Sequence, residues 1–106
     1  MALVSRTKAE TDEAQLVLRV TVYYSGRVQG VGFRYSVKRL VCGYEVSGSV
    51  ENLANGQVKL VAEGEKDELE AFLEAVGDSG LGPMIRGIDV HWSESTGEFQ
   101  GFDIVR

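Results

Sequence analysis

The sequence predicts an α+β fold, an α/β sandwich in which a mostly antiparallel sheet carries two helices on one face. Three observations support it: stretches of alternating apolar residues typical of half-buried strands, two stretches with the apolar spacing of amphipathic helices, and the order in which these follow one another. The chain of 106 residues is long enough for one domain with a single core. We expect this domain over residues 15–106 and a flexible N-terminal tail over residues 1–14, which are polar and show no period.

The first predicted strand and the first predicted helix flank a glycine-rich stretch. Residues 15–24 alternate as in a strand with one buried face, and the apolar positions are Leu18, Val20, Val22 and Tyr24. A helix is expected to begin near Gly32, because apolar residues recur there at helical spacing, at Phe33, Val37, Leu40 and Val41. Gly43 is expected to end this helix.

A β-hairpin is predicted next. Its first strand covers residues 46–53, with Gly48 as a point of close backbone approach, and its second strand begins at Val58. Asn55-Gly56 lies between them and is the strongest turn signal in the chain, since both residues tolerate a positive φ. Asn52 therefore stands at the end of a strand and directly before a tight turn, where its side chain is held with little slack.

A second helix, a long strand and a short closing strand complete the pattern. Acidic residues crowd the first turn of the helix, where they suit its dipole, and Gly77 is expected to end it. Ile88, Val90 and Trp92 alternate in the long strand, and the closing strand falls within residues 99–104. This order predicts a ferredoxin-like βαββαβ arrangement of four strands plus a short fifth, with both helices on one face.

Composition excludes several classes of protein. The net charge of −5 and the pI near 4.8 argue against a nucleic-acid binder. The single Cys42, expected to be a small core or half-buried residue, rules out an internal disulfide and a cysteine-based zinc site. No apolar run is long enough for a membrane helix and no signal-peptide pattern opens the chain, so we expect a cytoplasmic protein that binds no membrane.

The stretch from Gly26 to Arg34 contains three glycines, at positions 26, 30 and 32, and no acidic residue. A glycine-rich connection from a strand to a helix can turn backbone N–H groups inward as an anion nest, at a helix end whose dipole also favours negative charge. Between Glu13 and Glu45 there is no Asp or Glu, while five cations fall there: Arg19, Arg27, Arg34, Lys38 and Arg39. The sequence thus predicts a phosphate site with Arg34 as its charged ligand, against the alternative of chance clustering on a solvated surface.

This loop, together with Gly48–Asn52 and Asn55–Val58, resembles the acylphosphatases. The spacing between Arg34 and Asn52 fits that family without an insertion, and the resemblance covers nearly all of residues 15–106. It implies an enzyme that hydrolyses the carboxyl–phosphate bond of small acyl phosphates with no metal or other cofactor. A monomer suffices for this activity.

The resemblance also implies the roles of the site residues. Arg34 would hold the phosphoryl group through a bidentate, permanently charged guanidinium, and Asn52 would position the attacking water. Backbone N–H groups of the loop would bind the remaining phosphoryl oxygens; these residues are Gln29, Gly30, Val31, Gly32 and Phe33. Because a carboxylate leaves readily, positioning and charge stabilisation can suffice for such a reaction.

Four positions depart from the family pattern: Glu45 and Ser49 replace a glycine and a tryptophan, Glu51 replaces a basic residue and Lys59 an acidic one. A Glu51 side chain that points into the site would weaken phosphate binding, and one that points away would be harmless. Two other functions stay open from the sequence. One is a non-catalytic anion-binding regulatory module on the same fold, and the other is an RNA-binding sheet, which the acidic net charge disfavours.

Overall fold

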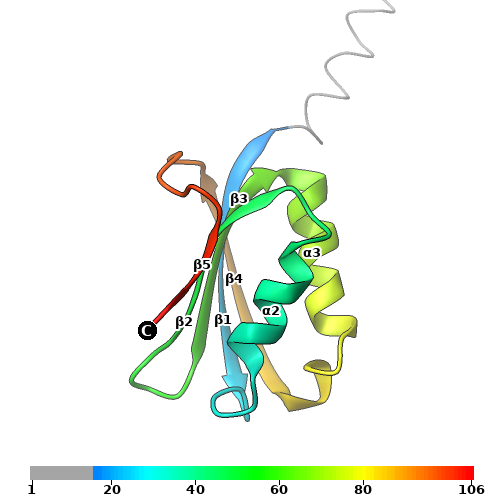
Figure 1. The fold of residues 1–106 in the computed structure, drawn as a ribbon, viewed down its shortest axis with the longest axis vertical. Helices are drawn as coiled ribbons and strands as arrows, with labels where there is room; N and C mark the ends of the chain where they lie inside the picture. The colour runs from blue at the N-terminus through cyan, green and yellow to red at the C-terminus, as the bar shows by residue number, and fades with distance from the viewer. Residues whose placement is uncertain (1–15) are drawn as a thin grey trace, which may run out of the picture.

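The computed structural model describes residues 16–106 (Figure 1). Its elements in chain order are β1 (Val17–Gly26), α2 (Phe33–Val41), β2 (Val46–Asn52), β3 (Val58–Glu65), α3 (Lys66–Asp78), the 3-10 helix η1 (Gly82–Met84), β4 (Ile85–Glu94) and β5 (Phe102–Val105). The predicted N-terminal tail, residues 1–14, lies outside the described residues, as does Gln15 of the first predicted strand.

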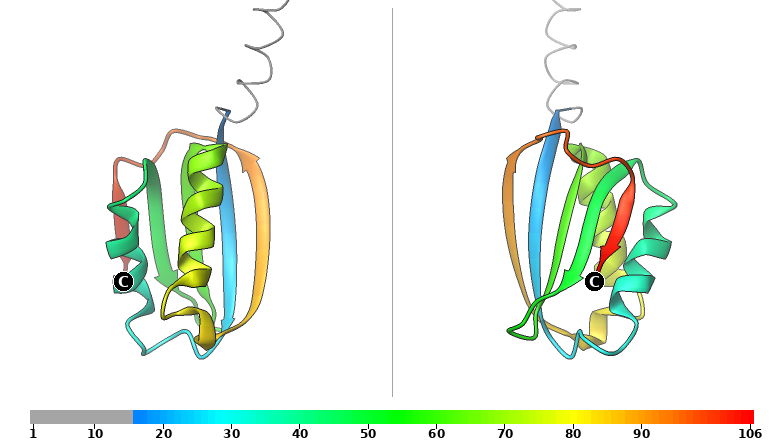
Figure 2. Two further views of the ribbon diagram at one scale, coloured as in Figure 1. Left: turned by 90° about the vertical axis from the view of Figure 1, so that its right-hand side faces the viewer. Right: turned by 60° about the vertical axis from the view of Figure 1, so that its left-hand side comes forward.

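The strands form one sheet in the order β4-β1-β3-β2-β5. All neighbouring pairs are antiparallel except β2 and β5, which run parallel. Both helices cover the same face of this sheet, as the two views in Figure 2 show. The predicted α+β, ferredoxin-like sandwich of four strands plus a short fifth is therefore confirmed.

The core lies between the sheet and the two helices. On β1 the predicted apolar face is buried, with Val20 and Val22 fully covered and Tyr24 nearly so. Both helices bury an apolar stripe against it, which includes Phe33 on α2 and Phe72 on α3. Strand alternation and helical spacing thus placed the core side chains correctly, because burial of apolar surface is what both patterns serve.

Helix α2 ends directly before Gly43, as predicted, whereas helix α3 runs one residue past the predicted stop at Gly77. Residues Cys42, Gly43 and Tyr44 each donate a backbone hydrogen bond to the third residue before them, so α2 ends in a tightened turn and Gly43 does not adopt a positive φ. Helix α3 continues through Gly77 to Asp78, because Ser79 ends it by donating from its hydroxyl and its N–H to the carbonyl of Val76.

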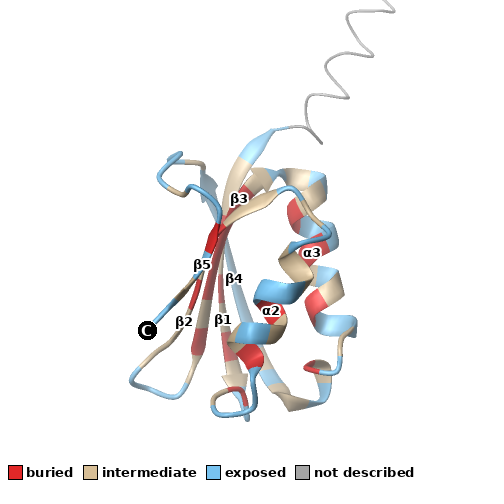
Figure 3. Cartoon of the chain, in the orientation of Figure 1, coloured by how far each residue is buried: buried red, intermediate tan, exposed pale blue. Residues whose placement is uncertain are grey.

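Strand β4 lies at an edge of the sheet and beyond the helices. Its alternating residues Ile88, Val90 and Trp92 are 55%, 41% and 41% exposed, although they share a face with the buried residues of β1. Helix α3 packs on β3 and β1, and α2 packs on β2 and β5, so neither helix covers β4. Figure 3 shows β4 mostly in the colour of exposed residues.

On the other face of the sheet, a buried carboxylate holds the loop between β4 and β5. Glu63 of β3 is 4% exposed and pairs with Arg19 of β1 at 2.8 Å. Its carboxylate also accepts hydrogen bonds from the N–H groups of Thr96 and Gly97 and from the hydroxyl of Ser95. Burial by itself raises the pKa of this carboxyl, but the hydrogen-bond donors outweigh it and lower the pKa to about 2.

Cys42 and His91, for which the sequence predicts no chemical role, lie at the surface. Cys42 is exposed, so its expected place in or near the core is wrong; it is the C-cap residue of α2. His91 is exposed and lies 3.1 Å from Asp89, with its ring edge against Tyr23. No helix within residues 16–106 has the length and apolar content that a membrane crossing requires.

Candidate active site

The site begins where β1 ends. The strand runs two residues further than predicted, to Gly26, which adopts φ +123°. A Cβ at Gly26 would collide with the backbone of Met84 and Arg86, and the N–H of Arg27 donates to the carbonyl of Met84 at 2.9 Å. The first glycine of the motif therefore serves a close approach of two backbone segments and anchors the start of the loop.

The other two glycines shape the loop itself. Gly30 and Gly32 both have φ +77°, and an added Cβ would meet nothing within 4 Å at either position, so backbone conformation rather than space requires glycine there. Gly32 is also the N-cap of α2. None of the N–H groups of Gly30, Val31 and Gly32 donates a hydrogen bond to another residue within 16–106. These donors are available to an anion at a helix N-terminus.

Arg34 lies in the first turn of α2 and is half-buried. Its guanidinium contacts the carbonyl of Val105 in β5 at 3.5 Å and forms no ion pair with any carboxylate among the described residues. A cation at a helix N-terminus opposes the dipole unless an anion compensates it. The uncompensated charge of Arg34 therefore fits a site for an anion.

Asn52 is the last residue of β2, and its side chain makes no hydrogen bond to another described residue. It lines a hollow of about 80 Å³ together with Arg34 and the loop; the other lining residues are Val28, Gly30, Gly32, Phe33 and Tyr35. That volume has room for a few water molecules and therefore for a small tetrahedral anion. The fold thus brings the predicted Arg34 and Asn52 to one small cavity.

The side chain of Gln29 points elsewhere. Its amide donates to the carbonyls of Leu53 and Gln57 at 2.8 and 2.9 Å, and both acceptors belong to the hairpin that follows Asn52. The Gln57 side chain in turn donates to the hydroxyl of Ser25 at the end of β1. These bonds fasten the loop to the hairpin, so only the backbone of Gln29 remains free for an anion.

The Val31 side chain also lies outside the small cavity. It is 38% exposed and lines a separate, larger hollow of about 410 Å³ on the other side of α2, together with Arg39, Leu81 and Met84. As with Gln29, any contribution of Val31 to the site comes from its backbone N–H.

Two departures from the family pattern compensate one another. Glu51 precedes Asn52 in β2 and therefore projects from the opposite face of the sheet, away from the helices and the cavity. Its cross-strand partner in β3 is Lys59, the other departure at this place. Opposite charges at directly paired positions favour each other, so the acidic Glu51 does not oppose phosphate binding.

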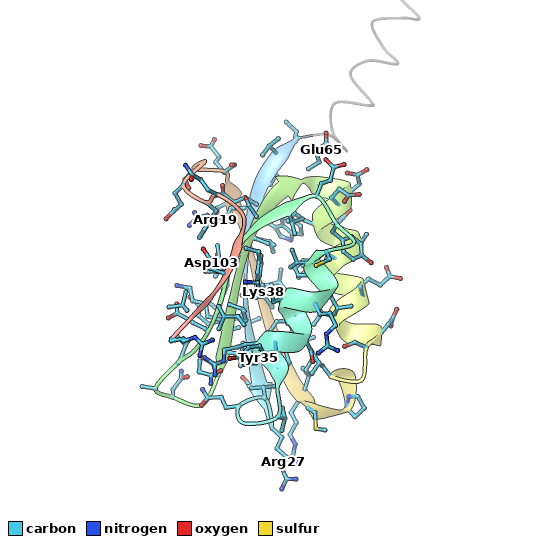
Figure 4. All side chains as sticks on the ribbon, in the orientation of Figure 1. Arg19, Arg27, Tyr35, Lys38, Glu65 and Asp103 are labelled. Carbon is cyan, nitrogen blue, oxygen red and sulfur yellow. The ribbon has the colours of Figure 1, made fainter. Side chains whose placement is uncertain are left out.

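The sequence groups five cations around the loop, but the structure places only one of them, Arg34, at the cavity. Arg19 lies at the far end of the sheet, bound to Glu63 and Glu98, and Figure 4 shows Arg27 projecting away from the body of the protein beyond the loop. Lys38 follows Arg34 by one helical turn and is exposed. The region from Glu13 to Glu45 thus supplies one arginine to the cavity, and its other cations serve the fold or face solvent.

Sequence reasoning missed Val28, Tyr35 and the Gln57 side chain. Val28 belongs to the loop, is fully buried and lines the cavity, and Tyr35 lines the cavity beside Arg34. The Gln57 side chain donates from the hairpin to Ser25 at the end of β1. No periodic signal marks them, because each acts through a contact between segments distant in sequence. Within the described part of the chain, no group of three or more His, Cys, Asp or Glu side chains is arranged to hold a metal ion.

Residues 20–104 match the acylphosphatase family model. The chain belongs to the acylphosphatase family, a family of hydrolases. It is 41% identical over 88 residues to an acylphosphatase of Salinibacter ruber, a match that covers 83% of this chain and 93% of that relative.

Solved structures agree with this assignment. The acylphosphatase of Bacillus subtilis superposes with a TM-score of 0.77 at 36% identity, over 84% of this chain and 99% of that one. Full-length HypF in a phosphate- and nucleotide-bound form superposes with a TM-score of 0.76 at 29% identity, over 87% of this chain but only 12% of HypF.

Proposed function

We propose that this protein hydrolyses small acyl phosphates to a carboxylate and inorganic phosphate without a metal ion, with Arg34 and Asn52 as its catalytic residues. One observation supports the proposal most directly: a small cavity brings together Arg34, backbone N–H groups of the loop and Asn52. Among the described residues, the arginine has no acidic partner and neither these N–H groups nor the asparagine side chain donates a hydrogen bond. The alternative is an anion-binding module without activity.

Arg34 and the loop bind the phosphoryl group. The guanidinium offers two parallel N–H donors to two phosphoryl oxygens, and the N–H groups of Gly30, Val31 and Gly32 are available to the third. In the transition state the negative charge of the phosphoryl group is spread over its three equatorial oxygens, while the bond to the carboxylate breaks. Donors fixed in place before the reaction therefore stabilise the transition state.

Asn52 orients the attacking water. Its neutral amide cannot take a proton at neutral pH, so it acts by a hydrogen bond that directs a water oxygen at phosphorus. The water oxygen forms the new P–O bond, the P–O bond to the acyl group breaks, and the electron pair leaves with the carboxylate. The water proton passes to a phosphoryl oxygen or to solvent.

Phosphate release from benzoyl phosphate in the presence of EDTA tests the proposal. We expect release well above the uncatalysed rate, and a loss of at least about a hundredfold in kcat for Arg34→Ala and for Asn52→Ala. Arg27→Ala is the matched control, since Arg27 projects away from the cavity. Release only after addition of a metal would contradict the metal-free mechanism, and phosphate binding without release would favour the anion-binding module.

A further inference from the structure

The cavity has room for a phosphoryl group but not for the acyl group attached to it. Its volume of about 80 Å³ holds a few water molecules, so an acyl group lies outside it, against the side chains at the rim. Apart from glycines, Tyr35 is the only exposed residue among those that line the cavity. Its side chain is 49% exposed, so it both lines the cavity and faces solvent.

Arg106 contacts Tyr35 from the end of β5. Its Nη2 donates to the Tyr35 hydroxyl at 2.9 Å, and its guanidinium carbon lies 5.8 Å from the centre of the Tyr35 ring. Strand β5 runs parallel to β2, with Val105 as the partner of Glu51. The residues that follow these two, Arg106 and Asn52, therefore lie next to each other where the strands end. Because Tyr35 belongs to α2, its contact with Arg106 places that guanidinium on the face of the sheet that holds the cavity.

The charge of Arg106 is uncompensated. It forms no ion pair with a carboxylate within residues 16–106. Alternation along β2 and β5 directs the acids nearest to it in these strands, Glu51 and Asp103, to the opposite face of the sheet. Helix α2 contains no acidic residue, and Figure 4 shows its exposed Lys38 on the same flank as Tyr35. In the described part of the chain, β2, β5 and α2 thus present cations and no acid to this side of the rim.

We propose that Arg106 and Tyr35 form a second anion-binding subsite, through which the protein prefers acyl phosphates whose acyl group carries a second negative charge. The subsite rests on the proposed function, to which it adds the class of acyl group. The second charge is a carboxylate or a phosphate-like group, since both accept two parallel N–H donors from a guanidinium.

The contacts of Arg106 suit it to this role. The bond to Tyr35 uses one N–H group of the guanidinium and leaves the others available to a ligand. The same bond and the ring hold the guanidinium at the rim, which reduces the entropy lost when an anion binds. The ring itself offers an apolar surface to the body of the acyl group. A neutral acyl group gains only this last contact, so Arg106 distinguishes charged from neutral acyl groups.

Matched substrates test the proposal. The acyl groups of 4-carboxybenzoyl phosphate and 4-carbamoylbenzoyl phosphate have nearly the same shape, and only the first carries a second negative charge. The 3-substituted isomers change the distance between the two groups, and the phosphonobenzoyl phosphates replace the carboxylate by a phosphonate. We expect kcat/KM of the wild type to favour the charged member of at least one pair by about fivefold or more. The difference should lie mainly in KM, because the second anion binds equally in the ground and transition states.

Variants of Arg106 assign the preference. Arg106→Gln should remove most of it, and Arg106→Glu should reverse it. Arg39→Gln is the matched control, because it removes the same charge from an exposed position beside the larger hollow on the other side of α2. This control should keep the wild-type ratio. Circular dichroism and thermal unfolding check that each variant folds, which the exposure of both positions favours. At about 1 M salt, where exposed charges are screened, the preference of the wild type should shrink.

The outcomes separate the subsite from the proposed function. A wild type that does not favour charged acyl groups, or an Arg106→Gln variant that keeps the wild-type ratio, would overturn the subsite and leave the hydrolysis in place. No release from any of these substrates would overturn both together. A preference that depends on Arg106 and is confined to the carboxylate or to the phosphonate would support the subsite and identify its anion.

Discussion

The side-chain amide of Gln29 donates to the backbone carbonyl of Gln57 at 2.9 Å, across the gap between the glycine-rich loop and the β2–β3 hairpin. A second bond from the same amide reaches the carbonyl of Leu53, the residue after Asn52. One side chain thus sets the distance between the segment that offers N–H donors and the segment that carries the asparagine.

Replacement of Gln29 by Leu should therefore lower kcat by about ten- to a hundredfold, because a shift of the order of 1 Å between reacting groups has such an effect. If Gln29 acts through Asn52, the loss should nearly disappear when Gln29→Leu is made in an Asn52→Ala background. Steady-state kinetics of the two single variants and the double variant measure this coupling.

Gln57→Ala is the matched control for the Gln29 variant, because it removes the bond to Ser25 and keeps the carbonyl that Gln29 uses. It should reduce kcat much less than Gln29→Leu. Losses of Gln29 and Asn52 that simply multiply would show that Gln29 supports the loop without positioning Asn52.

Arg34→Lys separates charge from shape. The variant keeps the positive charge but loses the planar fork, so we expect kcat to fall by at least about tenfold and inorganic phosphate to inhibit more weakly. Competition assays with phosphate measure the second effect. Arg27→Lys should change neither value, and equal inhibition constants for wild type and Arg34→Lys would contradict bidentate binding.

Arg34→Ala should also affect stability in an unusual direction. In the absence of phosphate the variant removes a cation from the positive end of α2, so its free energy of unfolding should equal or exceed that of the wild type by up to about 1 kcal/mol. Phosphate should raise the Tm of the wild type and not that of the variant, since only the former binds it. Calorimetry with and without phosphate checks both, and a clearly destabilised variant would assign Arg34 a structural role.

The Glu63 carboxyl makes stability sensitive to acid. Its folded-state pKa of about 2 lies below the ordinary value of 4.5, so its ionised form stabilises the fold above pH 4.5, and this contribution is lost as the pH falls toward 2. At neutral pH, Glu63→Gln should cost about 3 kcal/mol of unfolding free energy, and the difference from the wild type should shrink across that window. Urea unfolding at several pH values measures it. Glu70→Gln is the matched control, because it removes an exposed carboxylate and leaves the hydrogen bonds of Glu63 in place.

Gly48 leaves no room for a side chain. A Cβ there would overlap the carbonyl oxygen of Val61 in the neighbouring strand. Gly48→Ala should lower the free energy of unfolding by at least about 2 kcal/mol, because the backbone of β2 or β3 must shift. Thermal unfolding measures this. Gly43→Ala, where the nearest atom would be 3.7 Å from the new Cβ, should be close to neutral.

Local sequence was a good guide wherever one segment determines the outcome. The alternation in β1, the close approach at Gly48 and the presence of a turn before Val58 all follow from neighbouring residues. The predicted type I′ form of that turn is wrong, because only Gly56 and not Asn55 has a positive φ, and the N–H of Gly56 donates to the carbonyl of Leu53. Helix ends were less predictable. Glycine is typical of helix ends, yet α3 continues past Gly77 to Asp78. It ends there because Ser79 donates hydrogen bonds to the carbonyl of Val76. The position of a helix end depends on which hydrogen bonds form to the last carbonyl groups of the helix. Amino-acid composition does not show which of them form.

The charge pattern shows the same limit at longer range. Arg19 and Arg34 lie in one acid-free region of sequence, but pairing of β1 with β3 places Arg19 against Glu63 at the far end of the sheet. Proximity in sequence is not proximity in space once a strand separates two residues by its whole length. Of the five cations in that region, only Arg34 lines the cavity.

By itself the sequence determined the βαββαβ order, the buried faces of β1 and of the two helices, the family and the two residues on which the proposed chemistry depends. Periodicity and motif spacing are properties of the chain. Tertiary structure alone decided that Arg34 and Asn52 share one cavity, that Gln29 links their segments and that Glu51 faces away from them. It also decided that the apolar side of β4 is left exposed. Each of these is a relation between segments that only folding brings together, and contacts of this kind leave no periodic trace in the sequence.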